Sequence, residues 1–104
     1  MKKKIIVTKT TKAAKKKELA RAEGEQCFWV HKGPILSDLR GLALALRDGI
    51  TDEQFAHHVG KERNDFAAWV EAVLRDKKTA DNLRKTKVRK GAADAVLRSL
   101  KSYH

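Results

Sequence analysis

The sequence predicts an all-α fold, a compact bundle of four to five short helices preceded by a disordered basic N-terminal arm. Apolar residues recur at three- and four-residue spacing through residues 35–100, whereas the alternation typical of strands is almost absent after the first dozen residues. A chain of 104 residues buries only ~60% of its unfolded surface, which favours packed short helices. The first 24 residues hold too few apolar side chains to join such a core.

The predicted boundaries are a disordered arm over residues 1–24 and a helical domain over residues 25–104. The arm contains one apolar triplet, Ile5-Ile6-Val7, which is too little apolar surface to offset the entropy lost on ordering. Residues 11–22 are good helix formers. We expect them to become helical only on a partner.

The first part of the domain combines an extended segment and a helix. Cys27 to Val30 is apolar and is expected to lie across the helices as a lid or short strand, ended by Gly33. Pro34 is placed to open a helix, because proline suits the first helical position. Gly49 would end it. Its apolar face would consist of Ile35, Leu36, Leu39, Leu42, Ala43 and Leu46.

The next helix has unusually complete start signals. Thr51 and Gln54 have the spacing of a capping box, and Ile50 and Phe55 occupy the two positions of a hydrophobic staple. The sequence therefore predicts a helix that begins after Thr51 and ends at Gly60.

Three further segments complete the bundle. Asn64 or Asp65 caps a helix, Thr79 is expected to cap a short one that Gly91 ends, and residues 92–102 form the last. The apolar face of the helix after Asn64 would consist of Phe66, Trp69, Val70, Val73 and Leu74.

The net charge of +11 is divided unevenly along the chain. Residues 1–24 carry nine Lys or Arg and two Glu. Residues 25–72 carry five Lys or Arg and eight Asp or Glu, and residues 73–104 carry ten Lys or Arg and three Asp. Two blocks of +7 thus flank one of −3. Because duplex DNA carries one negative charge per ~1.7 Å, this pattern points to a polyanionic partner. The alternative is that the lysines only keep the protein soluble, which does not require such segregation.

The charge pattern predicts a non-enzymatic accessory protein that binds DNA or RNA mainly through phosphates, of the nucleoid- or ribosome-associated type and therefore cytoplasmic. The arm would supply Lys2, Lys3, Lys4, Lys9, Lys12, Lys15, Lys16, Lys17 and Arg21. A second surface would consist of Arg84, Lys85, Lys87, Arg89, Lys90, Arg98 and Lys101. Neither set has interleaved aromatic residues, so capture of single strands by base stacking is not indicated.

Two other binding functions compete with this one. The first is a protein-interaction module, with a partner or a second copy covering the apolar Cys27 to Val30 segment. The second is a helix-turn-helix DNA reader, because Phe55, Gly60 and Phe66 fall near its expected positions. Its recognition helix would present Glu62, Asp65 and Glu71, which phosphates repel.

A membrane location is not expected. No apolar run approaches the ~20 residues of a bilayer span, and the arm lacks a sustained apolar stripe. The single cysteine, Cys27, agrees with a reducing compartment, and we expect a soluble intracellular protein.

Histidines raise the alternatives of a metal site or a catalytic site, and neither is predicted. Cys27, His31, His57, His58 and His104 lack the two tight ligand pairs of a zinc site, and adjacent histidines on a helix point ~100° apart. No nucleophile motif or phosphate loop accompanies them, so no catalytic residue, metal or cofactor is assigned. We expect one of His57 and His58 to be solvated, and His58 to be partly buried with a hydrogen bond to Asp65.

Two stretches, CFWVHKGPILSDLRGLALAL and FAHHVGKERNDFAAWVEAVLRDKKTADNLRK, resemble a family of uncharacterised small helical domains found mostly in archaea and lesser-known bacteria. The shared pattern is a leading aromatic segment, a Leu-rich helix, Phe-x-x-His, and Asn-Asp-Phe-x-x-Trp-Val-x-x-Val-Leu-x-Asp. The matching positions are Phe28, Trp29, Leu36, Leu39, Leu42, Phe55, His58, Asn64, Asp65, Phe66, Trp69, Val70, Val73, Leu74, Asp76, Ala80 and Leu83. The resemblance spans residues 27–87 and implies a compact all-helical domain without implying an activity.

Overall fold

The computed structural model describes residues 19–103, and this part of the chain forms an all-α domain with one small hairpin, as predicted. Its elements are η2 (Gly24–Gln26), β1 (Phe28–Trp29), β2 (Ile35–Leu36), α1 (Leu39–Leu44), η3 (Ala45–Gly49), α2 (Asp52–His58), α3 (Asp65–Ala72), α4 (Lys77–Arg84) and α5 (Arg89–Leu100). No helix among the described residues is long and apolar enough to cross a membrane. Most of the predicted arm, residues 1–18, lies outside the described residues.

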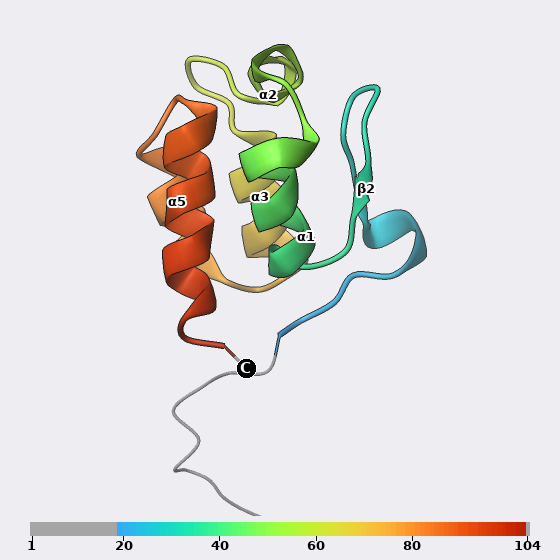
Figure 1. Cartoon of the computed structure of the whole chain (residues 1–104). Helices are drawn as coiled ribbons and strands as arrows, with labels where there is room; N and C mark the ends of the chain where they lie inside the picture. Colours follow the sequence, from blue (N-terminus) through green and yellow to red (C-terminus); the bar gives the residue numbers. More distant parts are fainter. Residues whose placement is uncertain (1–18, 104) are drawn as a thin grey trace, which may run out of the picture.

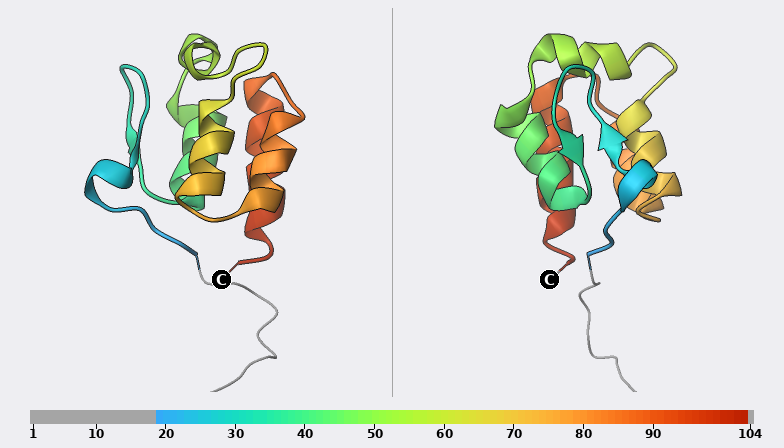
Figure 2. Two further views of the ribbon diagram at one scale, coloured as in Figure 1. Left: turned by 180° about the vertical axis from the view of Figure 1, so that it is seen from behind. Right: turned by 90° about the vertical axis from the view of Figure 1, so that its right-hand side faces the viewer.

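Each of the main helices packs against one or two of the others. α5 packs against α1 and α4, and α4 also packs against α3 (Figure 1). The β1–β2 hairpin lies on the side of the bundle away from α5 (Figure 2). The first described residues and the last ones lie at the same end of the molecule in every view (Figures 1 and 2).

The hairpin corrects the predicted start of the first helix. The Cys27 to Val30 segment, expected to be a lid or a short strand, contains β1. Pro34 does not open a helix, because Ile35–Leu36 pairs antiparallel with β1, with Phe28 opposite Leu36. α1 begins at Leu39, five residues after Pro34, because the Asp38 carboxylate accepts a hydrogen bond from the Gly41 N–H at 2.9 Å and caps the helix. Pairing places Phe28 and Leu36 in the core.

The predicted starts of α2 and α3 are confirmed. Thr51 and Gln54 form both hydrogen bonds of the capping box, and the staple residues Ile50 and Phe55 are buried. The Asn64 side chain caps α3 by accepting the Ala67 N–H.

The predicted starts of the last two helices are wrong. Asp76, not Thr79, caps α4 by accepting the Thr79 N–H at 3.0 Å, and the buried Thr79 hydroxyl donates to the same carboxylate. α5 begins at Arg89 and contains Gly91, which the sequence predicted to break a helix. Glycine is required there by space, because a Cβ at this position would lie 2.3 Å from the Thr86 Oγ1 atom.

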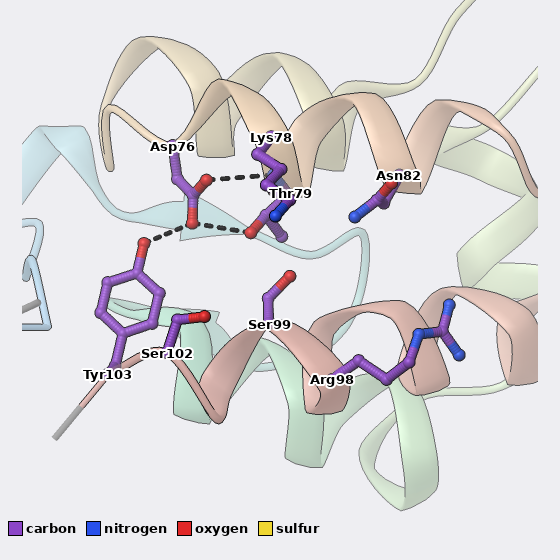
Figure 3. A pocket seen from close by; sticks show the side chains of 8 residues that line it. All are labelled: Asp76, Lys78, Thr79, Asn82, Arg98, Ser99, Ser102 and Tyr103. Carbon is purple, nitrogen blue, oxygen red and sulfur yellow. Dashed lines mark hydrogen bonds between the residues drawn. The ribbon is translucent and has the colours of Figure 1, made fainter. Parts of the chain in front are cut away.

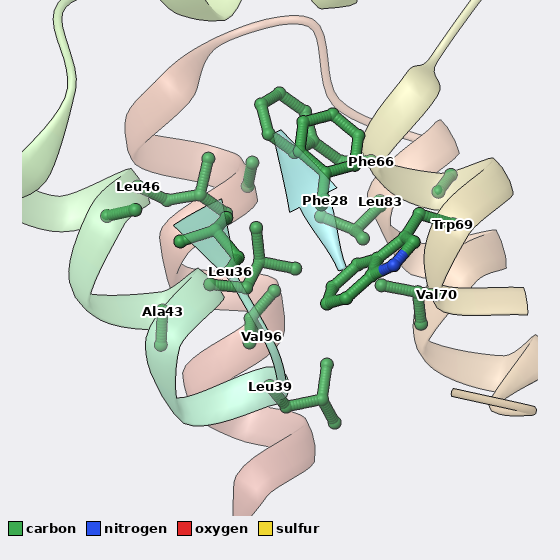
Figure 4. Packing of buried hydrophobic residues seen from close by; sticks show 14 of the residues in the cluster. Phe28, Leu36, Leu39, Ala43, Leu46, Phe66, Trp69, Val70, Leu83 and Val96 are labelled. Atoms are coloured by element: carbon green, nitrogen blue, oxygen red, sulfur yellow. The ribbon is translucent and has the colours of Figure 1, made fainter. Parts of the chain in front are cut away.

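The core lies between the hairpin and the helices (Figure 4). The rings of Phe28 and Phe66 stack with centroids 4.8 Å apart, and the Trp69 indole donates to the Gln26 carbonyl at 2.7 Å. Ala22 also lies in this core, and its N–H donates to the Ser37 carbonyl. The packed part of the chain therefore extends into residues that the sequence assigned to the arm.

Candidate nucleic-acid interface

The α4–α5 half of the molecule holds more cations than its carboxylates neutralise. Among the ten Lys and Arg of residues 73–104, Lys77 and Arg84 pair with Asp81, and Arg89 pairs with Asp52. The other seven have no carboxylate partner among the described residues: Arg75, Lys78, Lys85, Lys87, Lys90, Arg98 and Lys101. This concentration of uncompensated positive charge is the main electrostatic feature of the described chain.

The predicted arm residues lie mostly outside the described part of the chain. Arg21 is the exception: it is exposed, and its guanidinium lies 3.9 Å from the Asp38 carboxylate. The remaining eight are Lys2, Lys3, Lys4, Lys9, Lys12, Lys15, Lys16 and Lys17.

The predicted second surface divides into two groups. Lys85, Lys90, Arg98 and Lys101 are exposed and have no hydrogen-bond or ionic partner within residues 19–103. They form no ion pair with a carboxylate of this region, so their charge is available to a ligand.

Arg84, Lys87 and Arg89 instead bind the protein itself. Hydrogen bonding to Glu71, and then to Asp81, raises the pKa of the Arg84 guanidinium. Lys87 Nζ donates to the carbonyls of Gly60 and Lys61. Arg89 Nη1 donates to the carbonyls of Leu46 and Arg47, at the end of η3. These three residues tie α4 and α5 to α3, to the turn between α2 and α3, and to η3.

The start of α5 is unusual for a helix. Its N-cap, Val88, supplies no side-chain hydrogen bond, and Arg89 and Lys90 occupy the first turn. Helices favour acidic residues there, because the N–H groups of the first turn carry partial positive charge. The placement adds to the positive potential of this half.

A polar pocket of about 240 Å³ lies between α4 and α5 (Figure 3). At one end the Asp76 carboxylate, which is 4% exposed, accepts hydrogen bonds from the Thr79 N–H, the Thr79 hydroxyl and the Tyr103 hydroxyl. Burial, and then the hydrogen bond to Asp76, raise the pKa of Tyr103 well above its ordinary value. The phenol therefore remains a protonated donor at neutral pH.

Sequence reasoning missed the pocket because its residues come from two helices whose facing sides are known only from the packing. Lys78 and Asn82 are four residues apart on α4, as are Arg98 and Ser102 near the end of α5. The sequence did contain one signal for the pocket, namely pairs of polar residues four positions apart on two helices that follow each other in the chain.

The histidines form a structural cluster. His58 Nε2 accepts the His31 N–H at 3.0 Å, which leaves the proton on Nδ1 to donate to Asp65 at 3.0 Å, as predicted. The rings of His31 and His57 stack with centroids 3.9 Å apart. Desolvation, and then the neighbouring His31 and His58, lower the pKa of His57. Within the described residues, no group of three or more His, Cys, Asp or Glu could hold a metal ion.

The structure disfavours the helix-turn-helix alternative. α3, the would-be recognition helix, buries Phe66, Ala67, Trp69 and Val70. Its exposed positions are Ala68 and Ala72, which offer no hydrogen bond to a base edge. Its two acidic residues are engaged, Asp65 with His58 and Arg63, and Glu71 with Arg84.

The hairpin presents an apolar outer face. In the Cys27 to Val30 segment, Phe28 and Val30 are buried, while Trp29 is 65% exposed. Trp29 pairs across the hairpin with Ile35, which is 51% exposed. The apolar surface predicted for this segment is thus reduced to one cross-strand pair.

No protein-family model, curated protein or solved structure matches the chain. The resemblance to a family of small helical domains stays a prediction and carries no activity. The function is therefore argued from the surface alone.

Proposed function

We propose that this protein binds nucleic acid without catalysing a reaction, mainly through backbone phosphates, as a nucleoid- or ribosome-associated accessory protein of the cytoplasm. The observation that supports this best is the set of seven cations in the α4–α5 half that have no carboxylate partner among the described residues. A cation that is paired inside the protein has already lost part of its attraction for a phosphate. Within residues 19–103, six of the seven are not paired in this way, and the seventh, Lys87, donates to two backbone carbonyls.

The segregation of charge supports the same function. Residues 25–72 carry five Lys or Arg against eight acidic residues, so the positive surface belongs to the last third of the chain and to the arm. Phosphate contacts of this kind release counterions, and their contribution to affinity does not depend on base sequence. The expected binding is therefore strong at low salt and weakly selective for sequence.

The positions of the chain ends allow both basic regions to act on one strand. The described chain starts at Leu19, at the same end of the molecule as Tyr103 (Figures 1 and 2). Lys101 lies at this end, directly after α5. The described part of the chain therefore begins at the end of the molecule where α5 finishes.

The test is fluorescence-anisotropy binding of the full-length protein to labelled duplex DNA and RNA across a salt series. A triple variant carries Lys85→Gln, Lys90→Gln and Lys101→Gln, which removes three exposed cations without a partner among the described residues. Each phosphate contact contributes ~0.9 to the slope of log affinity against log salt on duplex DNA, so the loss of three contacts should lower the slope by about 2.7.

The matched control removes the same charge from the acidic middle of the chain, with Lys32→Gln, Arg40→Gln and Lys61→Gln. These residues are also exposed and have no carboxylate partner within the described residues. The control should retain the parental slope. Equal losses in both variants would mean that only net charge matters, and the absence of binding by the parent at low salt would refute the proposal.

A second candidate function is self-association or docking of a protein partner through the outer face of the hairpin. The exposed pair Trp29 and Ile35 favours it, because two large apolar side chains that lie opposite each other across the hairpin form a contiguous apolar patch, which a partner could cover. Sedimentation velocity over a concentration series tests self-association. A dimer that Trp29→Ser dissociates would support this function, and a monomer at all concentrations would leave only a different protein as partner.

A further inference from the structure

Most neutral polar side chains in residues 19–103 are occupied by the fold. Six of them cap helices or brace turns, namely Ser37, Thr51, Gln54, Asn64, Thr79 and Thr86. Four have no hydrogen-bond partner in this part of the chain, namely Gln26, Asn82, Ser99 and Ser102. Three of these four, Asn82, Ser99 and Ser102, line the single pocket between α4 and α5.

Two cationic side chains also line this pocket. Lys78 and Arg98 line it, and neither has a carboxylate partner among the described residues. Pockets for drug-sized molecules measure ~300 to 1,000 Å³. A pocket of about 240 Å³ instead suits one small anionic group together with a neighbouring polar group.

The two ends of the pocket differ in charge, because the buried Asp76 carboxylate lies at one end only. Asp76, Tyr103 and Ser102 lie at one end, Asn82 and Arg98 lie at the other, and Ser99 lies between them (Figure 3). A phosphate is repelled by the carboxylate and attracted by the guanidinium, so it belongs at the Arg98 end. The remaining space is bordered by the hydroxyls of Ser99 and Ser102, which can each donate and accept a hydrogen bond.

We propose that this pocket binds one ribose-phosphate unit of RNA, with the phosphate at Arg98 and Asn82 and the ribose 2′-hydroxyl at Ser99 and Ser102. The inference rests on the proposed function and narrows it from nucleic acid to RNA. A phosphate alone would leave the hydroxyl end of the pocket unused. The 2′-hydroxyl fits that end, because it is both donor and acceptor, and it is the group that distinguishes RNA from DNA.

The test compares oligouridine with oligodeoxyuridine and 2′-O-methyl oligouridine, all of about 20 nucleotides, which exceeds the site of a small domain. The three probes share base and phosphate and differ only at the 2′ position. Binding of each to the full-length protein is measured by fluorescence anisotropy at one low salt concentration. RNA should bind about three- to tenfold more tightly than either analogue, the range of one or two net hydrogen bonds.

Two variants locate the effect. Ser99→Ala combined with Ser102→Ala removes both hydroxyls without changing the charge, and it should abolish the preference for RNA, so that oligouridine and oligodeoxyuridine bind this variant equally. Arg98→Gln should weaken the binding of all three probes. Gln26→Ala is the control, because Gln26 is the unpartnered polar side chain outside the pocket, and it should keep the preference. Circular dichroism of each variant verifies the fold.

The outcomes separate the two proposals. If all three probes bind equally, or if the serine double variant retains the preference for RNA, the pocket does not recognise the ribose 2′-hydroxyl. The proposed nucleic-acid binding would then stand without this inference. If no probe binds at low salt, the proposed function fails and this inference fails with it.

Discussion

His58 joins the hairpin, α2 and the start of α3. Its ring accepts the His31 N–H, donates to Asp65 and contacts the Phe28 ring edge-on at 4.9 Å. The sequence predicted the bond to Asp65, because both residues flank one short turn. It could not predict the bond to His31, which depends on the folding back of a hairpin that the sequence assigned partly to a helix.

We predict that His58→Phe lowers the free energy of unfolding by about 1 to 3 kcal/mol, because the ring volume stays while a half-buried N–H loses its acceptor. Urea unfolding followed by tryptophan fluorescence measures the change. His57→Phe is the control: this neighbouring ring is exposed and stacks on His31, so the effect should stay within about 0.5 kcal/mol. Similar losses in both variants would contradict the role given to His58.

Tyr103 gives a second prediction at this scale, which can be read directly because the chain contains one tyrosine. Burial and the bond to Asp76 raise its pKa in the folded protein, so its phenolate absorbance should appear only well above the ordinary value of 10. In the unfolded state it should titrate normally. The stability that it contributes is therefore complete below pH 10 and is lost as the pH rises further.

An ultraviolet titration of the folded protein and of the protein in denaturant provides the measurement. Asp76→Asn should bring the folded pKa down towards the ordinary value while keeping a residue that caps helices well. A folded protein that titrates like the denatured one would contradict the hydrogen bond between Tyr103 and Asp76.

At the scale of elements, two of the four helix starts that a side chain caps were predicted, and the caps Asp38 of α1 and Asp76 of α4 were passed over for Pro34 and Thr79. Thr51 and Asn64 gave correct starts for α2 and α3. α5 starts without a side-chain cap, at Val88, and carries Gly91 in its first turn, so its local signals pointed to a break. Tertiary contacts decide this start, because Arg89 is held by Asp52 and by two carbonyls at the end of η3.

We predict that Gly91→Ala destabilises the protein by about 1 to 3 kcal/mol, the usual range for an overpacked site. In an ordinary helix the same change stabilises by about 1 kcal/mol, so the sign is opposite to that of propensity. The cause is the approach of the Thr86 side chain, which accepts the Val88 N–H at the start of α5. Thermal unfolding by circular dichroism measures the effect.

Gly60→Ala is the matched control for this change. A Cβ at Gly60 meets no atom within 4 Å, and its backbone lies outside the left-handed region. We expect a gain of about 0.4 to 1 kcal/mol from the restricted unfolded chain. If Gly91→Ala also stabilised the protein, this would contradict the conclusion that the Thr86 side chain leaves no room for a Cβ at position 91.

At the scale of the whole molecule, the fold class followed from the sequence because the apolar spacing and the short chain left few alternatives. The separation of the apolar surface from the basic surface did not follow from the sequence. The structure places the apolar pair Trp29 and Ile35 on the side away from α5, and it removes Arg84, Lys87 and Arg89 from the set of cations with no partner. Both results depend on how the helices pack, and linear charge counts contain no such information.

The most direct test of the account is a two-dimensional amide NMR titration of the full-length protein with oligouridine. We predict that, within residues 19–103, chemical-shift changes concentrate on residues 75–103 and leave β1 and β2 unchanged, because the cations without a carboxylate partner and the polar pocket lie on or beside α4 and α5. Changes centred on Trp29 and Ile35 instead, or no change at low salt, would contradict the assignment of nucleic-acid binding to the α4–α5 half.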